Sequence, residues 1–155
     1  MKKILWPTDL SENSLAIRDY VSELAQKYDA KIILLYIGLD LRSNFPAYGN
    51  YPNPELYSEF ESWEAKEAEK RLKTLCSEQM KGCPGMDVRV ELGDPAGKIL
   101  EVAEKEDVSM IIMATHGRNK AAADANVFGS ISQQVIKEAK VPIYVINPKT
   151  CKYKA

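Results

Sequence analysis

Three short stretches of the chain carry residue types that suit the binding of a charged ligand. Pro7-Thr8-Asp9 follows a brief apolar run, Met113-Ala114-Thr115-His116-Gly117 ends a second one, and Gly129-Ser130-Ile131-Ser132 precedes apolar residues at helical spacing. The Asp9 carboxylate suits a ligand hydroxyl, or a metal carried by phosphate. Glycine, two hydroxyls and the free N–H groups of a starting helix make the third stretch suited to an anion.

Each stretch also has a plainer structural interpretation. Ser130 is a good helix N-cap residue and need bind nothing else. Asp9 would serve equally well to brace the loop that leads into the first helix. Arg118 and Lys120 would either reach a phosphate or remain solvated loop residues. The residue types alone leave these alternatives open.

Catalytic signatures are missing around these stretches. His116 is the only histidine, and no Ser/His/Asp ordering or paired carboxylates accompany it. The chain contains neither the GxxxxGK[ST] pattern of a P-loop nor the GxGxxG dinucleotide fingerprint. We therefore expect a binding protein rather than an enzyme.

The bulk composition excludes several classes of protein. The length of 155 residues suits one domain with a real core, which we expect to span 1–155, and the net charge of −1 argues against a nucleic-acid partner. No stretch approaches the roughly 18 apolar residues of a membrane span. Cys76, Cys83 and Cys151 form no CxxC pair, so we expect free thiols, no disulfide framework, no zinc site and a cytoplasmic location.

The elements that must position the three stretches alternate between strand and helix. Short β-rich runs predict strands at 3–6, 31–37, 87–92, 109–114 and 141–146. Helices are predicted after Ser11, over about 55–80, after Pro95 and after Phe128. The segment 38–54 is irregular and 148–155 is a polar tail. Two apolar stripes are expected, on the first helix (Ile17, Val21, Leu24, Ala25, Tyr28) and on the long one (Leu56, Phe60, Trp63, Ala68, Leu72, Leu75).

This alternation predicts an α/β fold in which right-handed crossovers place helices on both faces of a parallel sheet. The run 31–37 hardly alternates, as expected of a strand covered on both faces, whereas 87–92 alternates and should lie near an edge. If the strands are ordered 3-2-1-4-5, the winding reverses between the first and fourth strands. Ligands of such sheets bind outside the carboxyl ends of the strands at the reversal, which here are Pro7–Asp9 and Ala114–Gly117.

Several segments resemble the universal stress protein family, in the same order along the chain. They are Ile4-Leu5-Trp6-Pro7-Thr8-Asp9-Leu10-Ser11-Glu12, Leu34-Leu35-Tyr36-Ile37, Gly93-Asp94-Pro95, Ile111-Ile112-Met113-Ala114-Thr115-His116-Gly117-Arg118, Phe128-Gly129-Ser130-Ile131-Ser132 and Val141-Pro142-Ile143-Tyr144-Val145-Ile146. Each piece is modest, but their order and spacing together are specific.

The resemblance implies a three-layer, Rossmann-like fold of the adenine nucleotide α-hydrolase-like type, with a five-stranded parallel sheet ordered 3-2-1-4-5. It also implies a homodimer through the fifth strand, from Val141 to Ile146. One branch of the family binds ATP, so ATP, ADP or AMP is the expected ligand, with Mg²⁺ where the phosphates carry it.

Carried over residue by residue, the resemblance places adenine near Ile37 and the ribose near Asp9, in a pocket that Pro7 and Thr8 begin. The phosphates would lie along Met113, Ala114, His116 and Gly117, and on Gly129, Ser130, Ile131 and Ser132. The protein would then be a non-catalytic stress-response protein, with at most slow ATP hydrolysis.

Two departures from the pattern of that branch bear on the ligand. Ala114 stands where the pattern Gly-x-x-Gly has its first glycine, and eleven residues separate Gly117 from Gly129 where the pattern has nine. A surface loop absorbs two extra residues at little entropic cost. The alternative is a nucleotide-free dimer that acts through protein contacts, for which Phe45, Tyr48 and Tyr51 in the segment 38–54 would provide a surface. An enzyme of related fold would need a second domain or a flavin loop.

Overall fold

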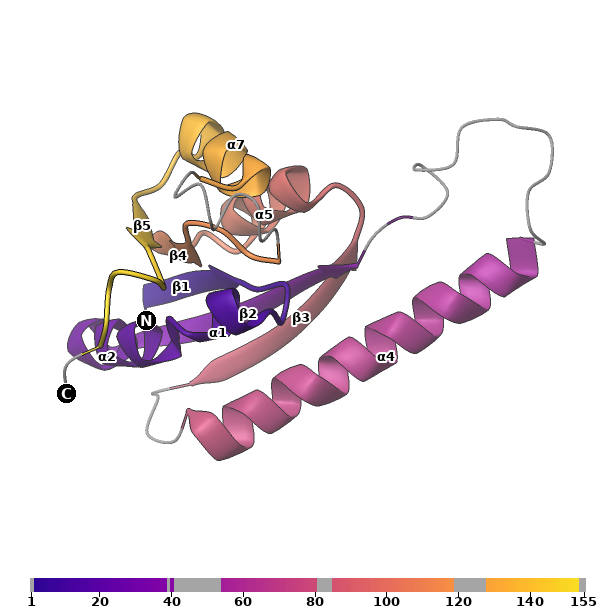
Figure 1. Cartoon of the computed structure of the whole chain (residues 1–155), viewed down its shortest axis with the longest axis horizontal. Helices are drawn as coiled ribbons and strands as arrows, with labels where there is room; N and C mark the ends of the chain where they lie inside the picture. Colours follow the sequence, from indigo (N-terminus) through magenta and orange to yellow (C-terminus); the bar gives the residue numbers. More distant parts are fainter. Residues whose placement is uncertain (1, 39, 41–53, 81–84, 119–127, 154–155) are drawn as a thin grey trace.

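The fold is built on one five-stranded parallel sheet (Figure 1). The computed structural model describes residues 2–38, 40, 54–80, 85–118 and 128–153. The strands are β1 (Lys2–Pro7), β2 (Ala30–Gly38), β3 (Met86–Leu92), β4 (Met110–Ala114) and β5 (Ile143–Ile146). Their spatial order is β3-β2-β1-β4-β5, which confirms the predicted order and the reversal of winding between β1 and β4.

Five helices connect these strands within the described residues. They are α1 (Glu12–Leu15), α2 (Arg18–Tyr28), α4 (Pro54–Gln79), α5 (Pro95–Lys105) and α7 (Ser130–Glu138). Ser11 is the N-cap of α1, as predicted, and its hydroxyl accepts from the Ser14 amide. The single helix expected after Ser11 is wrong, because the chain turns at Ala16 and Ile17 and restarts as α2. The predicted segment 38–54 lies outside the described residues apart from positions 38, 40 and 54.

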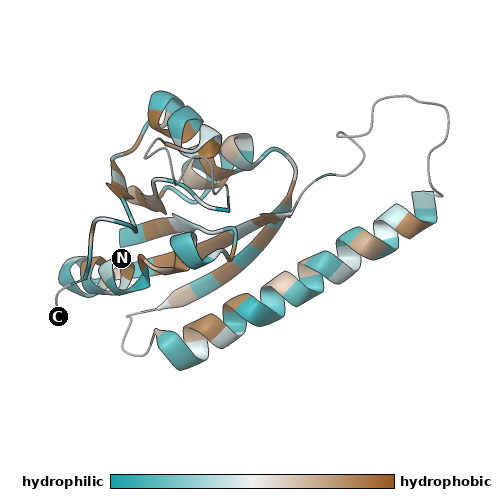
Figure 2. Cartoon of the chain, in the orientation of Figure 1, coloured by the Kyte–Doolittle hydropathy of each residue, from teal (hydrophilic) through white to brown (hydrophobic). Residues whose placement is uncertain are grey.

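The core forms two layers, one on each face of the sheet. One face packs on α2 and α4 through Ile17, Val21 and Leu72. The other packs on α5 and α7 through Ile99 and Val135. Figure 2 shows hydrophobic residues concentrated in the strands, with hydrophilic and hydrophobic residues mixed along the helices. The α/β three-layer prediction is confirmed.

Strand position follows from the amount of apolar side chain on each face. Ile32, Leu34 and Leu35 in β2 are fully buried, as expected of a strand with a helix layer on either side. The alternating strand β3 lies at the sheet edge, as predicted. The opposite edge is β5, in which Tyr144 keeps 51% of its surface exposed.

Only half of the predicted stripe of α4 faces the sheet. Ala68, Leu72 and Leu75 are buried, as expected. The expectation for the first half is wrong, because the large apolar side chains there are exposed: Leu56 59%, Phe60 46% and Trp63 59%. Tyr28, the last residue expected in the stripe of the first helix, is also exposed (45%).

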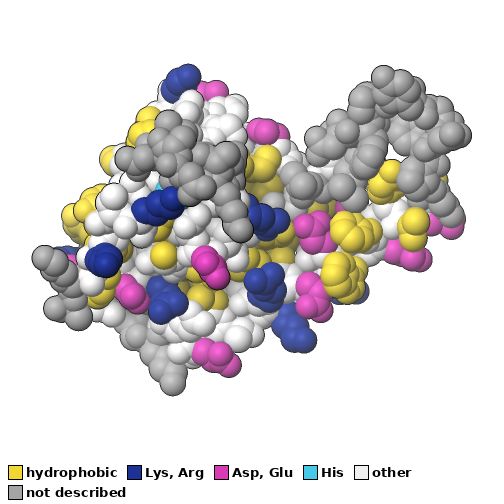
Figure 3. All heavy atoms as spheres, viewed as in Figure 1, with side chains coloured by type: hydrophobic (Ala, Val, Ile, Leu, Met, Phe, Trp, Pro, Cys, Tyr) yellow, Lys and Arg dark blue, Asp and Glu magenta, His cyan; other side chains and the backbone are white. Residues whose placement is uncertain are grey.

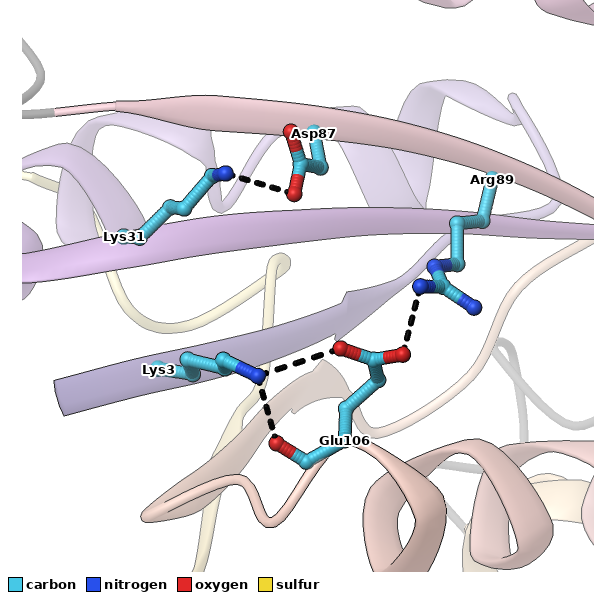
Figure 4. Close-up of polar contacts among 5 residues, drawn as sticks. All are labelled: Lys3, Lys31, Asp87, Arg89 and Glu106. Atoms are coloured by element: carbon cyan, nitrogen blue, oxygen red, sulfur yellow. Dashed lines mark hydrogen bonds and ion pairs between the residues drawn. The ribbon is translucent and has the colours of Figure 1, made fainter. Parts of the chain in front are cut away.

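Ion pairs hold the amino ends of β1, β2 and β3 and the end of α5 together (Figure 4). Glu106 follows α5 and bonds Lys3 at 3.1 Å with one carboxylate oxygen and Arg89 with the other. Lys31 and Asp87 pair at 2.7 Å across β2 and β3. Among the described residues, no helix is both long and apolar enough to cross a membrane.

Candidate functional site

A cavity of about 290 Å³ lies where the carboxyl ends of β1 and β4 meet the first turn of α7. All twelve residues that the sequence proposed for a ligand site line this one cavity: Pro7, Thr8, Asp9, Ile37, Met113, Ala114, His116, Gly117, Gly129, Ser130, Ile131 and Ser132. The cavity therefore sits at the reversal of the sheet, as topology predicts.

Four further residues line the cavity: Ser14, Pro95, Ile99 and Arg118. Pro95 and Ile99 belong to the first turns of α5, where the sequence shows an amphipathic stripe that is also a core signal. Ser14 lies in α1, one turn after the Ser11 cap. The only sequence signals for these positions are the Gly93-Asp94-Pro95 turn and the basic charge of Arg118.

Asp9 is held by backbone N–H groups from two loops. Its Oδ1 accepts from the Ser11 amide at 3.0 Å, and its Oδ2 accepts from the Arg118 amide at 2.8 Å. Burial raises the pKa of Asp9, but hydrogen bonds from Ser11, Ser14 and the Arg118 backbone outweigh that effect and leave the pKa below its ordinary value. The carboxylate is therefore ionised at neutral pH.

The loop after β4 is fastened to the loop after β1 at three points. The first is the bond from the Arg118 amide to Asp9 Oδ2, and in the second the Asn13 side-chain amide donates to the Gly117 carbonyl at 2.9 Å. The Arg118 guanidinium donates to the Asp9 carbonyl at 2.6 Å. The sequence left two roles open for Arg118, a phosphate contact or a solvated loop residue. In the structure its side chain and its amide join the two loops.

Gly117 is the residue that this close approach requires. A Cβ atom built at position 117 would lie 2.2 Å from Asp9 Oδ2, far inside contact distance. By contrast, a Cβ at Gly129 would meet nothing nearer than 3.6 Å, at the His116 Cα. Only the first of these two glycines is required by the packing of the chain itself.

The turn that follows β1 carries backbone strain. Leu10 has a φ of 59°, a left-handed conformation that a branched side chain rarely adopts. Its amide donates to Thr8 Oγ1 at 3.0 Å, and that buried hydroxyl also bonds the Ser14 hydroxyl at 2.8 Å. The strained turn brings Thr8, Asp9 and Ser14 to the same cavity wall.

The first turn of α7 is arranged differently from the sequence expectation. Its N-cap is Gly129, with φ −64° and ψ 155°, and no side chain caps it. Ser130 is therefore not the N-cap, and the interpretation that makes it one is wrong. Ser132 is buried and donates its single hydroxyl hydrogen toward the carbonyls of Thr115 (2.7 Å) and Gly129 (2.8 Å). Ser130 lies at the exposed start of the helix, beside amides that lack intrahelical acceptors.

His116 is 3% exposed, and its ring is tied to its neighbour. Nδ1 lies 2.8 Å from Thr115 Oγ1, while Nε2 is buried and has no hydrogen-bond partner among the described residues. Burial, with a smaller contribution from the charge of Lys149, lowers the pKa of His116 below its ordinary value. The imidazole is therefore neutral at pH 7.

Ala114 causes no backbone strain where the related pattern has glycine. The described non-glycine residues with positive φ are Leu10, Asp29 and Asp107, so Ala114 has an ordinary conformation. Its methyl group adds to the cavity wall beside Met113. The lengthened loop lies mostly in 119–127, outside the described residues, as does Lys120.

The arrangement joins three kinds of surface in one cavity. Ile37, Ile99 and Met113 give an apolar wall, Asp9 gives an ionised acceptor, and the start of α7 gives backbone donors at the positive end of a helix dipole. Such a cavity suits a ligand with a flat apolar part, hydroxyl groups and an anionic end. Within the described residues, no cluster of three or more His, Cys, Asp or Glu is placed to hold a metal ion.

The chain matches the family model described as the universal stress protein family over residues 1–147. It is 34% identical over 150 residues to universal stress protein MJ0531 of Methanocaldococcus jannaschii, covering 94% of this chain and 82% of that protein. The solved structure of MJ0577, from the same organism, has a TM-score of 0.76 at 27% identity, covering 97% of this chain and 98% of that one.

More distant structures share the fold. Universal stress proteins solved with cAMP, with AMP (from Arabidopsis thaliana) and with dAMP (from Archaeoglobus fulgidus) have TM-scores of 0.60, 0.59 and 0.60 at 18%, 17% and 16% identity. Each is covered over at least 91% of its length, and covers 95% of this chain. The family match, the 34% relative and the shared fold agree over nearly the whole chain. The chain therefore belongs to the universal stress protein family.

Proposed function

We propose that this universal stress protein is non-catalytic and binds an adenine nucleotide in the cavity between β1, β4 and α7. One observation carries the proposal: an apolar wall, an ionised Asp9 and the uncapped start of α7 line the same cavity of about 290 Å³. The solved relatives that hold AMP, dAMP and cAMP support the choice of an adenine nucleotide over other anions.

Each part of the nucleotide has a matching surface in this proposal. Adenine lies against Ile37 and Met113, whose side chains offer contact area without polar competition. Asp9 accepts a hydrogen bond from a ribose hydroxyl, because an ionised carboxylate has lone pairs beyond the two that the Ser11 and Arg118 amides occupy. The phosphate lies on the amides that begin α7, next to the Ser130 hydroxyl.

The same residues favour AMP, ADP or ATP binding without fast hydrolysis. Asp9 is the one carboxylate among the described residues that line the cavity, and it is held ionised by two backbone donors. No lysine lines the cavity among the described residues, and Arg118, with one N–H on the Asp9 carbonyl, is the single cation there, so few charges are available to stabilise a transferring phosphoryl group. A di- or triphosphate would bind together with Mg²⁺, and the Asp9 carboxylate would be the negatively charged side chain available to that ion.

Ser130→Asp separates nucleotide binding from folding. An acidic residue in the first turn of a helix stabilises it by about 0.3–1 kcal/mol, whereas the same charge repels a phosphate. Wild-type protein, freed of nucleotide by unfolding and refolding, is heated with AMP, ADP or ATP at 100 times Kd. It gains about 2.7 kcal/mol, which raises Tm by roughly 5–10 °C. Ser130→Asp should have an equal or higher Tm without nucleotide and lose this increase.

Gln134→Glu is the matched control, since it adds one negative charge to an exposed position of α7 beyond the first turn. This variant should keep the nucleotide-dependent rise in Tm. A wild-type Tm that millimolar adenine nucleotides leave unchanged would overturn the proposal. So would an unchanged rise in Ser130→Asp, because the phosphate would then lie elsewhere.

We further propose that the protein is a homodimer through β5, over residues 141–146. β5 is an edge strand, and Tyr144 projects an exposed aromatic ring from it. An unpaired edge offers backbone hydrogen bonds to a second copy. Tyr144→Lys should lower the mass in multi-angle light scattering from two chains toward one. A dimer without nucleotide binding would favour the alternative function, a module that acts through protein contacts.

A further inference from the structure

The amino-terminal half of α4 presents an apolar face that no described element covers. Leu56, Phe60 and Trp63 are 59%, 46% and 59% exposed, and the rings of Phe60 and Trp63 lie 5.9 Å apart. Figure 1 shows this half of α4 extending beyond the strands, and Figure 3 shows hydrophobic side chains gathered on it. An exposed cluster with two large aromatic rings is a common mark of an interaction surface.

This face is distinct from the face that packs on the sheet. Leu56, Phe60 and Trp63 follow i, i+4, i+7 spacing and so share one side of the helix. Ala68, the first buried residue of the next stripe, comes five positions after Trp63. At about 100° per residue, it lies roughly 140° around the helix from Trp63. The side of α4 that carries Leu56, Phe60 and Trp63 therefore points away from the sheet, and a longer sheet would not bury it.

The charges on α4 indicate what covers it. Residues 54–65 contain four glutamates, at 55, 59, 61 and 64, and no lysine or arginine; Glu64 bonds Tyr36 of β2, whereas Glu59 lies one turn before Trp63, beside the exposed face. Residues 66–73 contain four basic residues, at 66, 70, 71 and 73, against glutamates at 67 and 69. Two α4 helices that overlapped through their first halves alone would crowd glutamates together. An antiparallel pair that lays each first half along the other's second half matches opposite charges.

We propose that two copies of this chain associate through an antiparallel α4–α4 pair, with a two-fold axis near Ala65. In this register Glu59 of one copy lies beside Lys70 of the other. The lysine stems then cover Phe60 and Trp63, as long cationic side chains commonly do over aromatic faces. The contact is isologous, because the same patch is used by both copies.

This interface is separate from the β5 edge. α4 packs on β2 and β3, which lie toward the edge of the sheet opposite to β5. A chain could therefore use both interfaces at once, and the inference stands whether or not the cavity binds a nucleotide. The contact uses one narrow face of each α4 helix and is therefore small, so self-association falls in the weak, concentration-dependent class.

Sedimentation velocity in the Tyr144→Lys background tests the α4 contact alone. The mass should rise with concentration toward two chains, and Phe60→Ser should raise the dimer dissociation constant at least tenfold. Trp63 reports the same event by a blue shift of its emission, since the other tryptophan, Trp6, is fully buried already. Equal masses for Phe60→Ser and its parent at all concentrations would overturn the inference.

A charge exchange identifies the occupant as a second copy. Glu59→Lys and Lys70→Glu should each weaken the dimer, and the double variant should restore it. The two positions are eleven residues apart, about 16 Å along one helix, so the restoring contact must be between copies. Dimerisation that the double variant leaves weakened would overturn this register, and the apolar face would then belong to a different partner. Circular dichroism confirms equal helix content in all variants.

Discussion

Gly117→Ala is expected to damage the fold through one identifiable contact. The added Cβ would lie 2.2 Å from Asp9 Oδ2, so the carboxylate or the loop must move by about 1 Å to restore ordinary contact. That movement breaks the 2.8 Å bond from the Arg118 amide to Asp9 Oδ2. A hydrogen bond to a charged group contributes about 1.5–3 kcal/mol.

Part of this loss is recovered elsewhere. Alanine restricts the unfolded chain more than glycine and returns about 0.4–1 kcal/mol. The expected net destabilisation is therefore about 1–2 kcal/mol, or a fall in Tm of roughly 2–8 °C for a domain of this size. Urea unfolding followed by circular dichroism measures it. Gly129→Ala, whose Cβ meets nothing nearer than 3.6 Å, is the control for the collision: alanine is a poorer N-cap than glycine, so the variant should lose about 0.5–1 kcal/mol, by the same amount with or without Asp9.

A double-mutant cycle identifies the cause. In an Asp9→Ala background the collision partner is gone, so Gly117→Ala should then be close to neutral. An equal destabilisation by Gly117→Ala in both backgrounds would rule out the collision with Asp9, because the loss would then come from the backbone of residue 117.

Three further substitutions test other parts of the structure. Asp29 ends α2 with a φ of 47°, so Asp29→Gly should stabilise the protein by about 0.5–1 kcal/mol in thermal unfolding; a lower Tm would contradict this. Burial lowers the pKa of His116, so as the pH falls this histidine is protonated in the unfolded chain before it is protonated in the folded protein. The free energy of unfolding of the wild type should therefore fall as the pH drops below about 6.5. His116→Asn should flatten that fall, and identical pH profiles would count against it. The hydrogen bond from Lys3 and the charge of Arg89 lower the pKa of Glu106. The ionised Glu106 therefore stabilises the fold fully above the ordinary pKa of a glutamate, and this stabilisation is lost as the pH falls through the lowered pKa of the folded state. Glu106→Gln should be less stable than wild type at pH 7 and converge with it in acid, whereas a constant difference would assign the effect to packing.

The full strand order came from the family resemblance, whereas local signals predicted only which strands are interior and which lie at an edge. The non-alternating run of β2 indicated an interior strand and the alternating run of β3 an edge strand. Residues that line the cavity mostly follow strand ends or begin a helix, and topology brings those places together. Pro95 and Ile99 were missed because an apolar residue near a helix start looks the same whether it faces a core or a cavity.

The errors share a physical cause. Periodicity shows that apolar residues lie on one side of a helix, but it does not show which side meets the sheet. Trp63 and Ala68 were therefore placed in one stripe although about 140° separates them. Propensity favours serine as an N-cap, yet at α7 the cap is Gly129, and Ser132 bonds the Thr115 carbonyl from within the helix. Such a choice depends on a neighbouring strand end that the local sequence does not contain.

A crystal structure of the protein grown with AMP would show whether an adenine nucleotide binds between β1, β4 and α7. Adenine should lie against Ile37 and Met113, a ribose hydroxyl on Asp9, and the phosphate on the amides that begin α7 beside Ser130. An AMP molecule bound anywhere else, or this cavity found empty at saturating AMP, would contradict this prediction.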